Sequence, residues 1–509
     1  MPNTIAAILR QQARTRADHT LLVCDDERLS YAEAERRSAL LARALIALGA
    51  GKGTHIGLLY PNGAEFVIAM LAAARLGAVV VPFSTFATAR EIREQLLDSD
   101  VRILLSARSF RSHYYVQRLT EALDVSDVER ATPIFTTATP QLRHVVFDPP
   151  NGSAGPELLA AMEDDVEGCD ALAIVYTSGS TSTPKGVMHT HAALLNHQRN
   201  LNEIRRYAAA DRLFCNSPFF WIGGFAFALL ATLAARASLV CSNAADAGDT
   251  LDLLEREKPT MTNGFTAGIA QLATHPSFGD RDLSSMRRGN LYPIMARDVR
   301  PADPELRHNM LGMTESGSVV LIDGDESNQP ESRRGSYGRP APGFETKIVD
   351  RDSTGAGELC LRGPYMMQGY YKRAREECFD ADGWFHTGDL MRADADGYFY
   401  FLGRIGSMIK TAGANVSPAE VERAIASATS GMAAHVIGIP DAQRGQVVAA
   451  AVIVPDGDVF DEAALRQGLK AELSAYKIPK RFVALSRTEL PVLSSGKVDA
   501  ERLKVLFDG

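Results

Sequence analysis

The sequence lacks the features that mark extracellular, fibrous and nucleic-acid-binding proteins. Its 509 residues include only six cysteines, which are scattered without any C-x-x-C pair, so no disulfide framework is indicated. Lys and Arg number 54 against 62 Asp and Glu, and the resulting net charge of −8 argues against a general nucleic-acid binder. With 46% apolar and 23% charged residues, the composition also excludes disorder, collagen and a coiled coil.

The sequence also has no clear membrane span or targeting segment. The stretch Leu213–Ala235 carries no charge, but it contains Pro218 and Gly223-Gly224, which a lipid-facing helix tolerates poorly. We therefore expect a buried strand, a turn and then a buried helix in this stretch. The first apolar positions, Ile5–Leu9, have helical spacing and no basic segment before them. These features predict a cytoplasmic protein without a membrane span.

The first 170 residues alternate between two kinds of apolar pattern. Tyr31–Leu48 and Ala64–Leu76 have the 3.6-residue periodicity of helices, whereas His55–Tyr60 and Ala78–Pro82 are short apolar runs. Short buried strands that alternate with helices are typical of a mostly parallel sheet with crossover helices. The pattern continues in three later runs that we also expect to be strands: Ala171–Tyr176, Arg236–Cys241 and Thr260–Gly264.

The pattern changes after about residue 334. The segments Thr346–Val349, Glu358–Arg362 and Tyr398–Phe401 are short and are separated by glycine-rich turns, which predicts a smaller antiparallel unit. Beyond Gly403-Arg404, a tail of roughly 100 residues is long enough to form its own domain. Its expected elements are two helices and two strands: Ala419–Ala428, Glu462–Leu473, His435–Ile439 and Val447–Val454.

The most informative segment, Tyr176–Val187, reads Y-T-S-G-S-T-S-T-P-K-G-V. Six hydroxyl side chains surround Gly179, and Lys185 follows them. Small residues let backbone N–H groups approach an anion, and the hydroxyls and the lysine add donors and charge, so this composition indicates a polyphosphate cradle. It is not a Walker A loop, because Pro184 stands where the second glycine is required. The chain also has no G-x-G-x-x-G and no G-x-S-x-G motif, so neither dinucleotide binding nor a hydrolase elbow is supported.

This segment resembles the phosphate loop of the adenylate-forming superfamily, which includes acyl-CoA synthetases, aryl-CoA ligases, nonribosomal adenylation domains and beetle luciferases. The family pattern is Y-T-S-G-T-T-G-x-P-K-G-V followed by T-H, and the match continues through Thr190-His191 with Ser180 for Thr and Ser182 for Gly. Further segments match in family order and span nearly the whole chain: Ser217–Gly224, Gly312–Ser316, Gly335–Pro340, Gly357–Leu359, Gly369–Tyr371, Trp384–Asp389, Gly403-Arg404, Ile409-Lys410, Pro418–Glu422 and Pro491–Lys497.

The resemblance implies an α/β fold with two domains. Residues 1–404 are expected to form a large adenylation domain of stacked, mostly parallel sheets with crossover helices, including the phosphate loop at 176–187. A small antiparallel, barrel-like subdomain is expected within it at about 335–402. Residues 405–509 are expected to form a small, mobile α+β domain that carries the catalytic lysine.

The resemblance also implies a reaction in two halves. A free carboxylate has no useful leaving group at neutral pH, so the acid and MgATP first form acyl-AMP and pyrophosphate, and the acyl group then passes to a thiol, expected to be that of coenzyme A. By resemblance, Lys497 bridges the acid and the α-phosphate, and Thr314 donates to the α-phosphate. Glu315, together with Thr177, is expected to hold Mg²⁺ on the phosphates.

The remaining expected contacts fall into four groups. The nucleoside of ATP is expected to contact Asp389, Arg404, Leu291, Asn309, Leu311 and Gly312. Its phosphates are expected to contact Thr177, Ser178, Gly179, Ser180, Thr181, Thr183 and Lys185. An apolar or aromatic acid is expected to contact Phe219, Phe220, Trp221, Gly224, Phe225, Gly264, Leu291, Tyr292, Gly312 and Met313. The hinge and the acceptor side are expected to involve Gly406, Lys410 and Gly413.

The chain departs from the family pattern at several positions. Leu311 stands where an aromatic residue commonly stacks on adenine, and Asn290–Pro293 replaces a G-G-A-P segment. Trp221 replaces a frequent histidine near the acyl carboxylate, Gly406 stands where Asp or Lys is usual, and Gln446 replaces a frequent glutamate. These departures concern ATP affinity, the acid pocket and the hinge, and they leave the residues expected to perform adenylation in place.

Two alternatives to the acid–thiol ligase remain open at this point. An amide ligase would pass the acyl group to an amine, and the atypical Asn290–Pro293 wall leaves room for that acceptor. A non-catalytic nucleotide-binding protein would keep only the fold, which the presence of Glu315, Asp389 and Lys497 opposes. The expected ligands are ATP, Mg²⁺, coenzyme A and a small carboxylic acid, with no nucleic-acid partner, in a monomer or homodimer.

Overall fold

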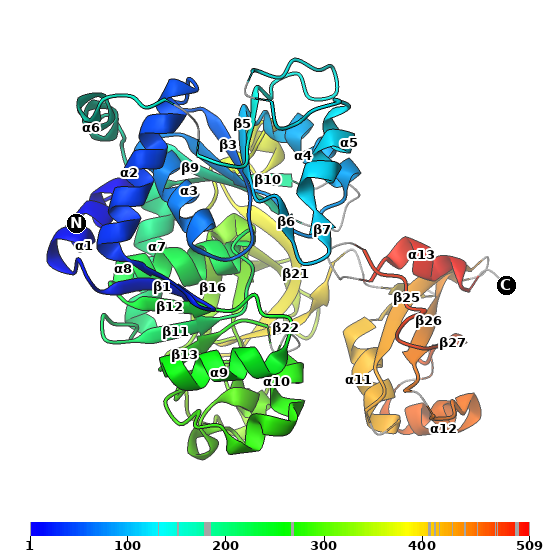
Figure 1. Cartoon of the computed structure of the whole chain (residues 1–509). Coiled ribbons are helices and arrows are strands. Elements are labelled where there is room, and N and C mark those ends of the chain that lie inside the picture. Colours follow the sequence, from blue (N-terminus) through cyan, green and yellow to red (C-terminus); the bar gives the residue numbers. More distant parts are fainter. Residues whose placement is uncertain are drawn as a thin grey trace. The chain divides into compact units, whose positions relative to one another are not determined.

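A computed structural model describes residues 2–130, 132–149, 152–177, 185–265, 269–405, 409–411, 414–416, 418–429, 431–441, 444–455, 457–473, 475, 477–493 and 498–507. The chain, drawn in Figure 1 with colours that follow the sequence, divides into two compact units by its internal contacts. The first unit comprises Met1–Glu345 and Arg362–Gly383, and the second comprises Thr346–Leu361 and Trp384–Gly509. Among the helices built from described residues, none has the length and apolar character needed to cross a bilayer. The expected domain boundary at 404/405 stays a prediction.

The first unit contains a seven-stranded sheet in the order β20-β10-β9-β4-β3-β5-β8. Four neighbouring pairs, from β9 to β8, are parallel, and β10 and β20 are added antiparallel at one edge. This confirms the mostly parallel sheet predicted from the apolar runs. The strands are β3 (His55–Leu59), β4 (Val79–Pro82), β5 (Ile103–Ser106), β8 (His144–Val146), β9 (Ala171–Thr177), β10 (Lys185–Thr190) and β20 (Gly369–Tyr370).

A six-stranded sheet of the same unit has the order β14-β13-β11-β12-β1-β2. All its pairs are parallel except the β1–β2 hairpin. Its strands are β1 (Thr20–Cys24), β2 (Glu27–Ser30), β11 (Arg212–Cys215), β12 (Ser238–Cys241), β13 (Met261–Asn263) and β14 (Arg288–Gly289). Smaller pieces are the hairpin of β6 (Ser109–Phe110) and β7 (His113–Tyr114), and a third sheet of β15 (Leu311–Met313), β16 (Ser318–Ile322) and β17 (Arg339–Pro340).

The helix α3 (Ala64–Arg75) has no polar face, since every residue except Glu65 is buried. Its alanines let neighbouring elements approach closely from all sides, and it packs in one core with α1, α2 and strands of both large sheets. The helices of this unit are α1 (Ile5–Thr15), α2 (Tyr31–Ala47), α4 (Ala89–Ser99), α5 (Tyr115–Leu123), α6 (Pro156–Asp164), α7 (His191–Ile204), α8 (Ala231–Ala235), α9 (Ala247–Glu257) and α10 (Ala270–Thr274).

The uncharged stretch around Gly224 folds as a strand, a turn and a buried helix, as predicted. The helix begins at Gly223 as a π-helix, η1 (Gly223–Leu230), and continues as α8. A Cβ atom on Gly224 would lie 2.1 Å from the carbonyl oxygen of Pro218, so only glycine allows the turn to pack this tightly against the helix start.

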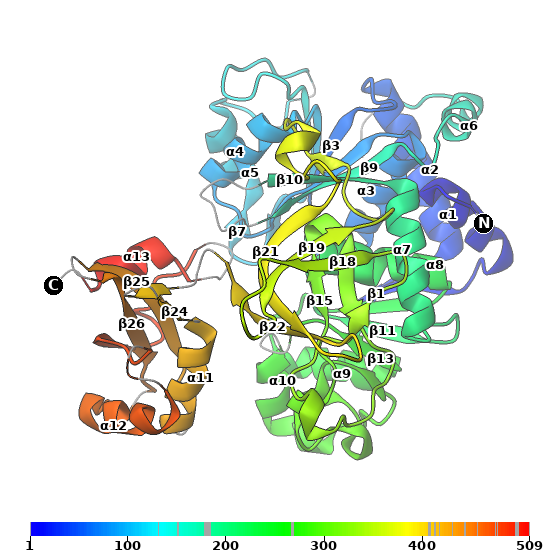
Figure 2. The same ribbon diagram turned by 180° about the vertical axis from the view of Figure 1, so that it is seen from behind.

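The second unit contains the sheet β18-β19-β21-β22, drawn in yellow-green to yellow in Figure 2, in which β19, β21 and β22 are antiparallel. Its strands are β18 (Glu345–Val349), β19 (Gly357–Arg362), β21 (Phe385–Ala393) and β22 (Phe399–Arg404). The α+β tail of this unit builds a sheet of β23 (Ile409–Thr411), β24 (Ala414–Val416), β25 (Ala434–Asp441), β26 (Gly445–Ile453) and β27 (Arg481–Leu485). Its helices are α11 (Pro418–Ala428), α12 (Glu462–Glu472) and α13 (Ala500–Val505).

Candidate active site

The expected phosphate loop connects the antiparallel strands β9 and β10. Thr177 ends β9, Lys185 begins β10, and the two residues face each other across the ladder. The strand pair therefore fixes both ends of the loop at one edge of the parallel part of the sheet. The remaining predicted phosphate contacts, Ser178, Gly179, Ser180, Thr181 and Thr183, lie outside the described residues.

Tyr370 connects the lysine of this hairpin to the predicted metal ligand. The Tyr370 hydroxyl donates to Glu315 Oε1 at 2.8 Å, and Lys185 Nζ lies 4.9 Å from the centroid of the Tyr370 ring. Burial, followed by the negative charge of Glu315, raises the pKa of the Tyr370 hydroxyl well above its usual value. The hydroxyl therefore keeps its proton and orients the carboxylate, while the ring face stabilises the ammonium group.

A buried histidine fixes the turn that carries Thr314 and Glu315. His189 on β10 is fully buried, and its Nε2 lies 2.7 Å from the carbonyl oxygen of Thr314, to which it donates. Burial lowers the pKa of His189 to about 4, so the ring is neutral at physiological pH and acts as a donor without adding charge. The neighbouring His191 instead accepts from the backbone N–H of Ile5, which agrees with a structural role for the H-x-H pair.

Two asparagines hold the backbone just beyond the ends of the parallel strands β11, β13 and β14. Asn216 donates to the carbonyl oxygen of Phe265 and accepts from its N–H, both at 2.9 Å. Asn290 makes the same pair of bonds with Gly264, at 2.8 and 3.1 Å. Each side-chain amide therefore replaces the ladder partner that the backbone loses where the sheet ends. Ligand sites in open parallel sheets lie at this carboxyl edge.

A row of aromatic rings follows these strand ends. The ring centroids of Phe220 and Trp221 are 5.4 Å apart, and those of Trp221 and Phe265 are 5.5 Å apart, with edge-on geometry in both pairs. Phe86 extends the row at 5.9 Å from Phe220. Phe220 is buried, whereas Phe86 is 37% and Phe265 is 52% exposed, so both ends of the row reach the surface. Phe225 is instead fully buried and contacts Phe66, as does Phe219.

The other predicted nucleoside and acid contacts occupy neighbouring segments. Leu291 is buried just after β14, and Tyr292 beside it is half-buried. Leu311, Gly312 and Met313 form β15, where Gly312 is exposed and its neighbours are partly buried. The backbone N–H of the exposed Asn309 donates to the carbonyl oxygen of Ser336 at 2.7 Å, which fixes the segment that precedes β15.

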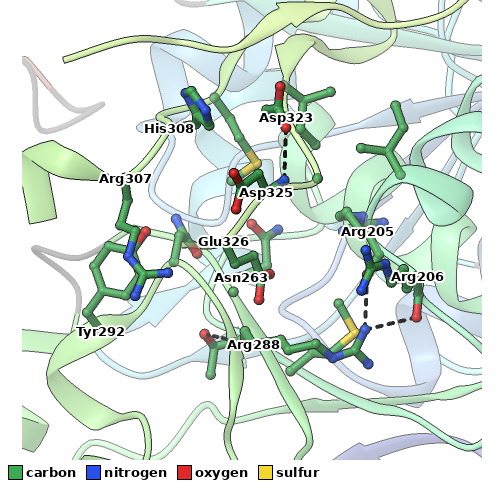
Figure 3. A pocket seen from close by; sticks show the side chains of 18 of the residues that line it. Arg205, Arg206, Asn263, Arg288, Tyr292, Arg307, His308, Asp323, Asp325 and Glu326 are labelled. Atoms are coloured by element: carbon green, nitrogen blue, oxygen red, sulfur yellow. Dashed lines mark hydrogen bonds between the residues drawn. The ribbon is translucent and has the colours of Figure 1, made fainter. Parts of the chain in front are cut away.

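Tyr292 also lines a cavity of about 540 Å³ with a strongly charged wall (Figure 3). Figure 3 shows Tyr292 and Arg307 on the left and Arg205 and Arg206 on the right. Glu326 contributes to the same wall, and burial raises the pKa of its carboxyl group. No local sequence pattern predicts this cavity, because most of its lining comes from separated segments: 204–206, 261–263, 288–290, 307–310 and 322–327.

Within the second unit, Asp389 and Arg404 face each other across β21 and β22. Arg404 Nε lies 2.7 Å from Asp389 Oδ1, and the Asp389 side chain is 3% exposed. The Asp389 N–H donates to Thr387 Oγ1 at 3.0 Å. Lys410 lies on β23, and its side chain is outside the described part, as are Gly406, Gly413 and Lys497 as a whole.

Several contributing residues escaped the sequence interpretation. Tyr370 stands only within a segment that matches the family pattern, and the sequence analysis predicts no role for His189 or Asn216. The G-Y-Y segment and the H-x-H pair were visible signals, but their partners lie more than 50 residues away in sequence. The donor types found here suit a nucleotide and its metal: a carboxylate oriented by Tyr370, a strand-end threonine and a lysine at the loop.

Comparison with known proteins agrees with this geometry. The model of the AMP-binding enzyme family matches residues 9–371, and that of the AMP-binding enzyme C-terminal domain matches residues 420–497. A feruloyl-CoA synthase of Amycolatopsis sp is 30% identical over 487 residues, covering 92% of each chain. An indoleacetate–CoA ligase of Aromatoleum aromaticum is 30% identical over 497 residues, covering 94% of this chain and 93% of that protein.

One solved structure that resembles the chain holds a reaction intermediate. The o-succinylbenzoate CoA synthetase of Bacillus subtilis, in complex with the acyl-adenylate intermediate OSB-AMP, has a TM-score of 0.77 and 25% sequence identity. The match covers 99% of this chain and 98% of that one. The similarity therefore extends over both units of the chain.

Proposed function

The chain belongs to the AMP-binding enzyme family and is an ATP-dependent, AMP-forming acid–CoA ligase, and from this premise we propose which acid it takes and which residues act. The overall reaction joins a small organic acid to coenzyme A through an acyl-adenylate, with release of pyrophosphate. The relatives named as CoA ligases favour the thiol over the amine acceptor.

The proposed substrate is an apolar carboxylic acid that carries a ring. The observation that supports this choice is the row of Phe220, Trp221 and Phe265 at the carboxyl edge of the six-stranded sheet. A ring of the ligand can make the same edge-on contact with this row, and each such contact stabilises binding by roughly 0.5–1.5 kcal/mol beyond the burial of apolar area.

The residue assignments follow the chemistry of each group. Glu315, oriented by Tyr370, is proposed to hold Mg²⁺ with Thr177, while Lys185 and the adjoining loop hold the phosphates. Thr314 is proposed to donate to the α-phosphate from a turn fixed by His189. When bound, Mg²⁺ neutralises phosphate charge and so lets the acid carboxylate approach.

The nucleoside and the acceptor complete the proposal. Asp389, whose orientation is set by Arg404, accepts the ribose hydroxyls, and Leu311 packs on adenine. Lys497 bridges the acid and the α-phosphate in the first half-reaction, and rotation about Gly406 then exchanges it for the segment around Gly413 and Lys410. A cytoplasmic location and a monomeric or homodimeric state are part of the same proposal.

The first test measures pyrophosphate release with a panel of acids, each with and without coenzyme A. Ring-bearing acids should give release without coenzyme A and sustained turnover with it. Lys497→Ala should lower adenylation by roughly a hundredfold or more, because one preorganised charge contact is lost. Transfer from supplied acyl-AMP to coenzyme A should stay near the rate of the original protein. An equal loss in both steps would contradict the assignment, and the exposed Lys470 offers a matched Lys470→Ala control.

The second test separates the acid pocket from the rest. Trp221→Ala should raise KM for ring-bearing acids more than KM for short aliphatic acids, while KM for ATP stays unchanged. Phe135→Ala is the control, because Phe135 is 74% exposed and contacts Arg143 away from the aromatic row. An equal change in KM for all acids would show that the aromatic row does not select ring-bearing acids.

A further inference from the structure

Three metal-ligating side chains converge on one face of the antiparallel sheet in the second unit. Glu358 and Cys360 lie two residues apart on β19, on either side of an irregularity in the ladder with β21, and Cys360 is paired with His386 on β21. One ligand atom from each of the three lies within 4.8 Å of the other two. Within the described part of the chain, no other set of three such residues meets this condition.

The contacts show that the three groups share one nitrogen. His386 Nδ1 lies 2.8 Å from Glu358 Oε2 and 3.5 Å from Cys360 Sγ. A catalytic thiol relay would place the thiol on one ring nitrogen and the carboxylate on the other. Here both approach the same atom, so the arrangement is unsuited to activating a nucleophile and suited to surrounding a single small cation.

The distances fit a tetrahedral ion after a small adjustment. With metal–sulfur bonds of about 2.3 Å and metal–nitrogen bonds of about 2.0–2.1 Å, tetrahedral angles separate the sulfur and nitrogen by roughly 3.6 Å. The observed Cys360–His386 separation is 3.5 Å. The carboxylate oxygen and the nitrogen would need to move apart from 2.8 Å to roughly 3.4 Å, which a small side-chain rotation provides.

We propose that Glu358, Cys360 and His386 form a binding site for a divalent cation of the zinc class. A thiolate and an imidazole select such borderline-soft ions over Mg²⁺ and Ca²⁺, which prefer all-oxygen sites. On binding, the Cys360 thiol loses its proton to solvent, the imidazole stays neutral with its proton on Nε2, and Glu358 binds through Oε2. Water fills the fourth position, because His386 is 44% exposed.

The surroundings already orient the carboxylate for this role. The backbone N–H of Gly388 donates to Glu358 Oε1 at 2.9 Å, which leaves Oε2 directed at His386. Ligating carboxylates are commonly fixed by such a second hydrogen bond. Gly388 adjoins Asp389, so a bound cation would restrict the turn that carries the proposed ribose contact. Binding of the cation does not depend on the proposed function, because it can be measured without ATP, acid or coenzyme A.

The test titrates the full-length, reduced protein with Co²⁺ in the absence of nucleotide and coenzyme A. A thiolate–cobalt bond gives a near-ultraviolet charge-transfer band, which should appear at one equivalent, strengthen as pH rises and disappear on addition of Zn²⁺ but not of excess Mg²⁺. Cys360→Ser should abolish the band. His386→Asn and Glu358→Gln should weaken binding by roughly tenfold or more.

Another cysteine of the chain provides the control for the cobalt band. Cys169→Ser removes the exposed cysteine of the first unit and should leave the band unchanged. Absence of the band in the original protein, its survival in Cys360→Ser, or its loss in Cys169→Ser would overturn the proposal. If Cys360→Ser fails to fold, His386→Asn decides, because His386 is half-exposed and unaltered Co²⁺ affinity in this variant would also overturn the proposal.

Discussion

The chain holds its proposed ligand-binding residues in two different ways. In the first unit they follow strands that have ended, and the side-chain amides of Asn216 and Asn290 supply the missing backbone bonds. In the second unit the ladder continues through the site, so that Asp389 and Arg404 are direct cross-strand partners. The first arrangement therefore depends on the close fit of individual side-chain amides to backbone groups. The second depends on the register of two paired strands and tolerates local changes.

The largest difference in stability is expected when one glycine in each region is replaced by alanine. At Gly264 φ is +147°, and an added Cβ would lie 1.7 Å from Asn216 Oδ1, so Gly264→Ala should destabilise the first unit by more than about 3 kcal/mol. At Gly388 φ is +71°, and no atom among the described residues lies within 4 Å of an added Cβ. Gly388→Ala should therefore cost only about 1–2 kcal/mol. Urea unfolding of both variants tests the contrast, and equal losses would contradict it.

Acid should also separate the two units. Burial lowers the pKa of each of His189, His191 and His197, all in the first unit, to about 4. The unfolded chain then binds more protons between pH 6.5 and 4, so the stability of the first unit should fall as pH falls through this window. Each histidine contributes up to about 1.4 kcal/mol per pH unit. The two histidines of the second unit, His386 and His435, are not fully buried.

The two tryptophans of the chain make this measurable, since Trp221 lies in the first unit and Trp384 in the second. Fluorescence-monitored unfolding of Trp384→Phe reports the first unit, and that of Trp221→Phe reports the second. Between pH 6.5 and 4 the first signal should lose more stability than the second. A larger loss in the second unit would show that the buried histidines do not govern acid sensitivity.

A smaller effect is expected from the hydroxyl that connects Tyr370 to Glu315. Tyr370→Phe removes the 2.8 Å hydrogen bond and keeps the ring beside Lys185. Loss of an outer contact to a metal ligand should raise the Mg²⁺ concentration needed for half-maximal adenylation by roughly tenfold. Tyr371→Phe is a matched control, because the Tyr371 hydroxyl donates to Asp100 instead. An unchanged Mg²⁺ requirement in Tyr370→Phe would contradict the assignment of Glu315 as a metal ligand oriented by Tyr370.

The smallest effect is expected at Leu311. A tyrosine there should stack on adenine and add roughly 0.5–1.5 kcal/mol, which corresponds to a two- to tenfold lower KM for ATP. The KM for the acid should not change, and steady-state kinetics with ATP and acid varied separately measures both. If the acid KM shifts while the ATP KM stays constant, Leu311 belongs to the acid pocket.

The sequence predicted the elements of the fold better than their long-range pairing. The apolar run at 171–176 correctly indicated β9, and periodicity located α2 and α3 to within one residue. It did not reveal that β10 turns back antiparallel on β9. It also did not reveal that Gly369–Tyr370 joins that edge, because strand pairing over more than 180 residues leaves no local pattern.

The site was predicted unevenly for a related reason. Motifs single out Thr314, Glu315 and Asp389, whose roles stay predictions, whereas the contacts of His189 with Thr314 and of Tyr370 with Glu315 appear only in three dimensions. Asn290 appeared as a departure from a family segment, and the structure explains it as the residue that bonds both backbone groups of Gly264.

The bonds that hold the backbone at the strand ends come from Asn216 and Asn290 and not from the aromatic residues nearby. Asn216 and Asn290 bond the main chain of Phe265 and Gly264 and make no use of the rings around them. Mutations at Trp221 or Phe265 can therefore change the aromatic row one step at a time while the bonded backbone keeps its position. Related sequences could therefore change their acid substrate through substitutions of these rings while the protein stays folded.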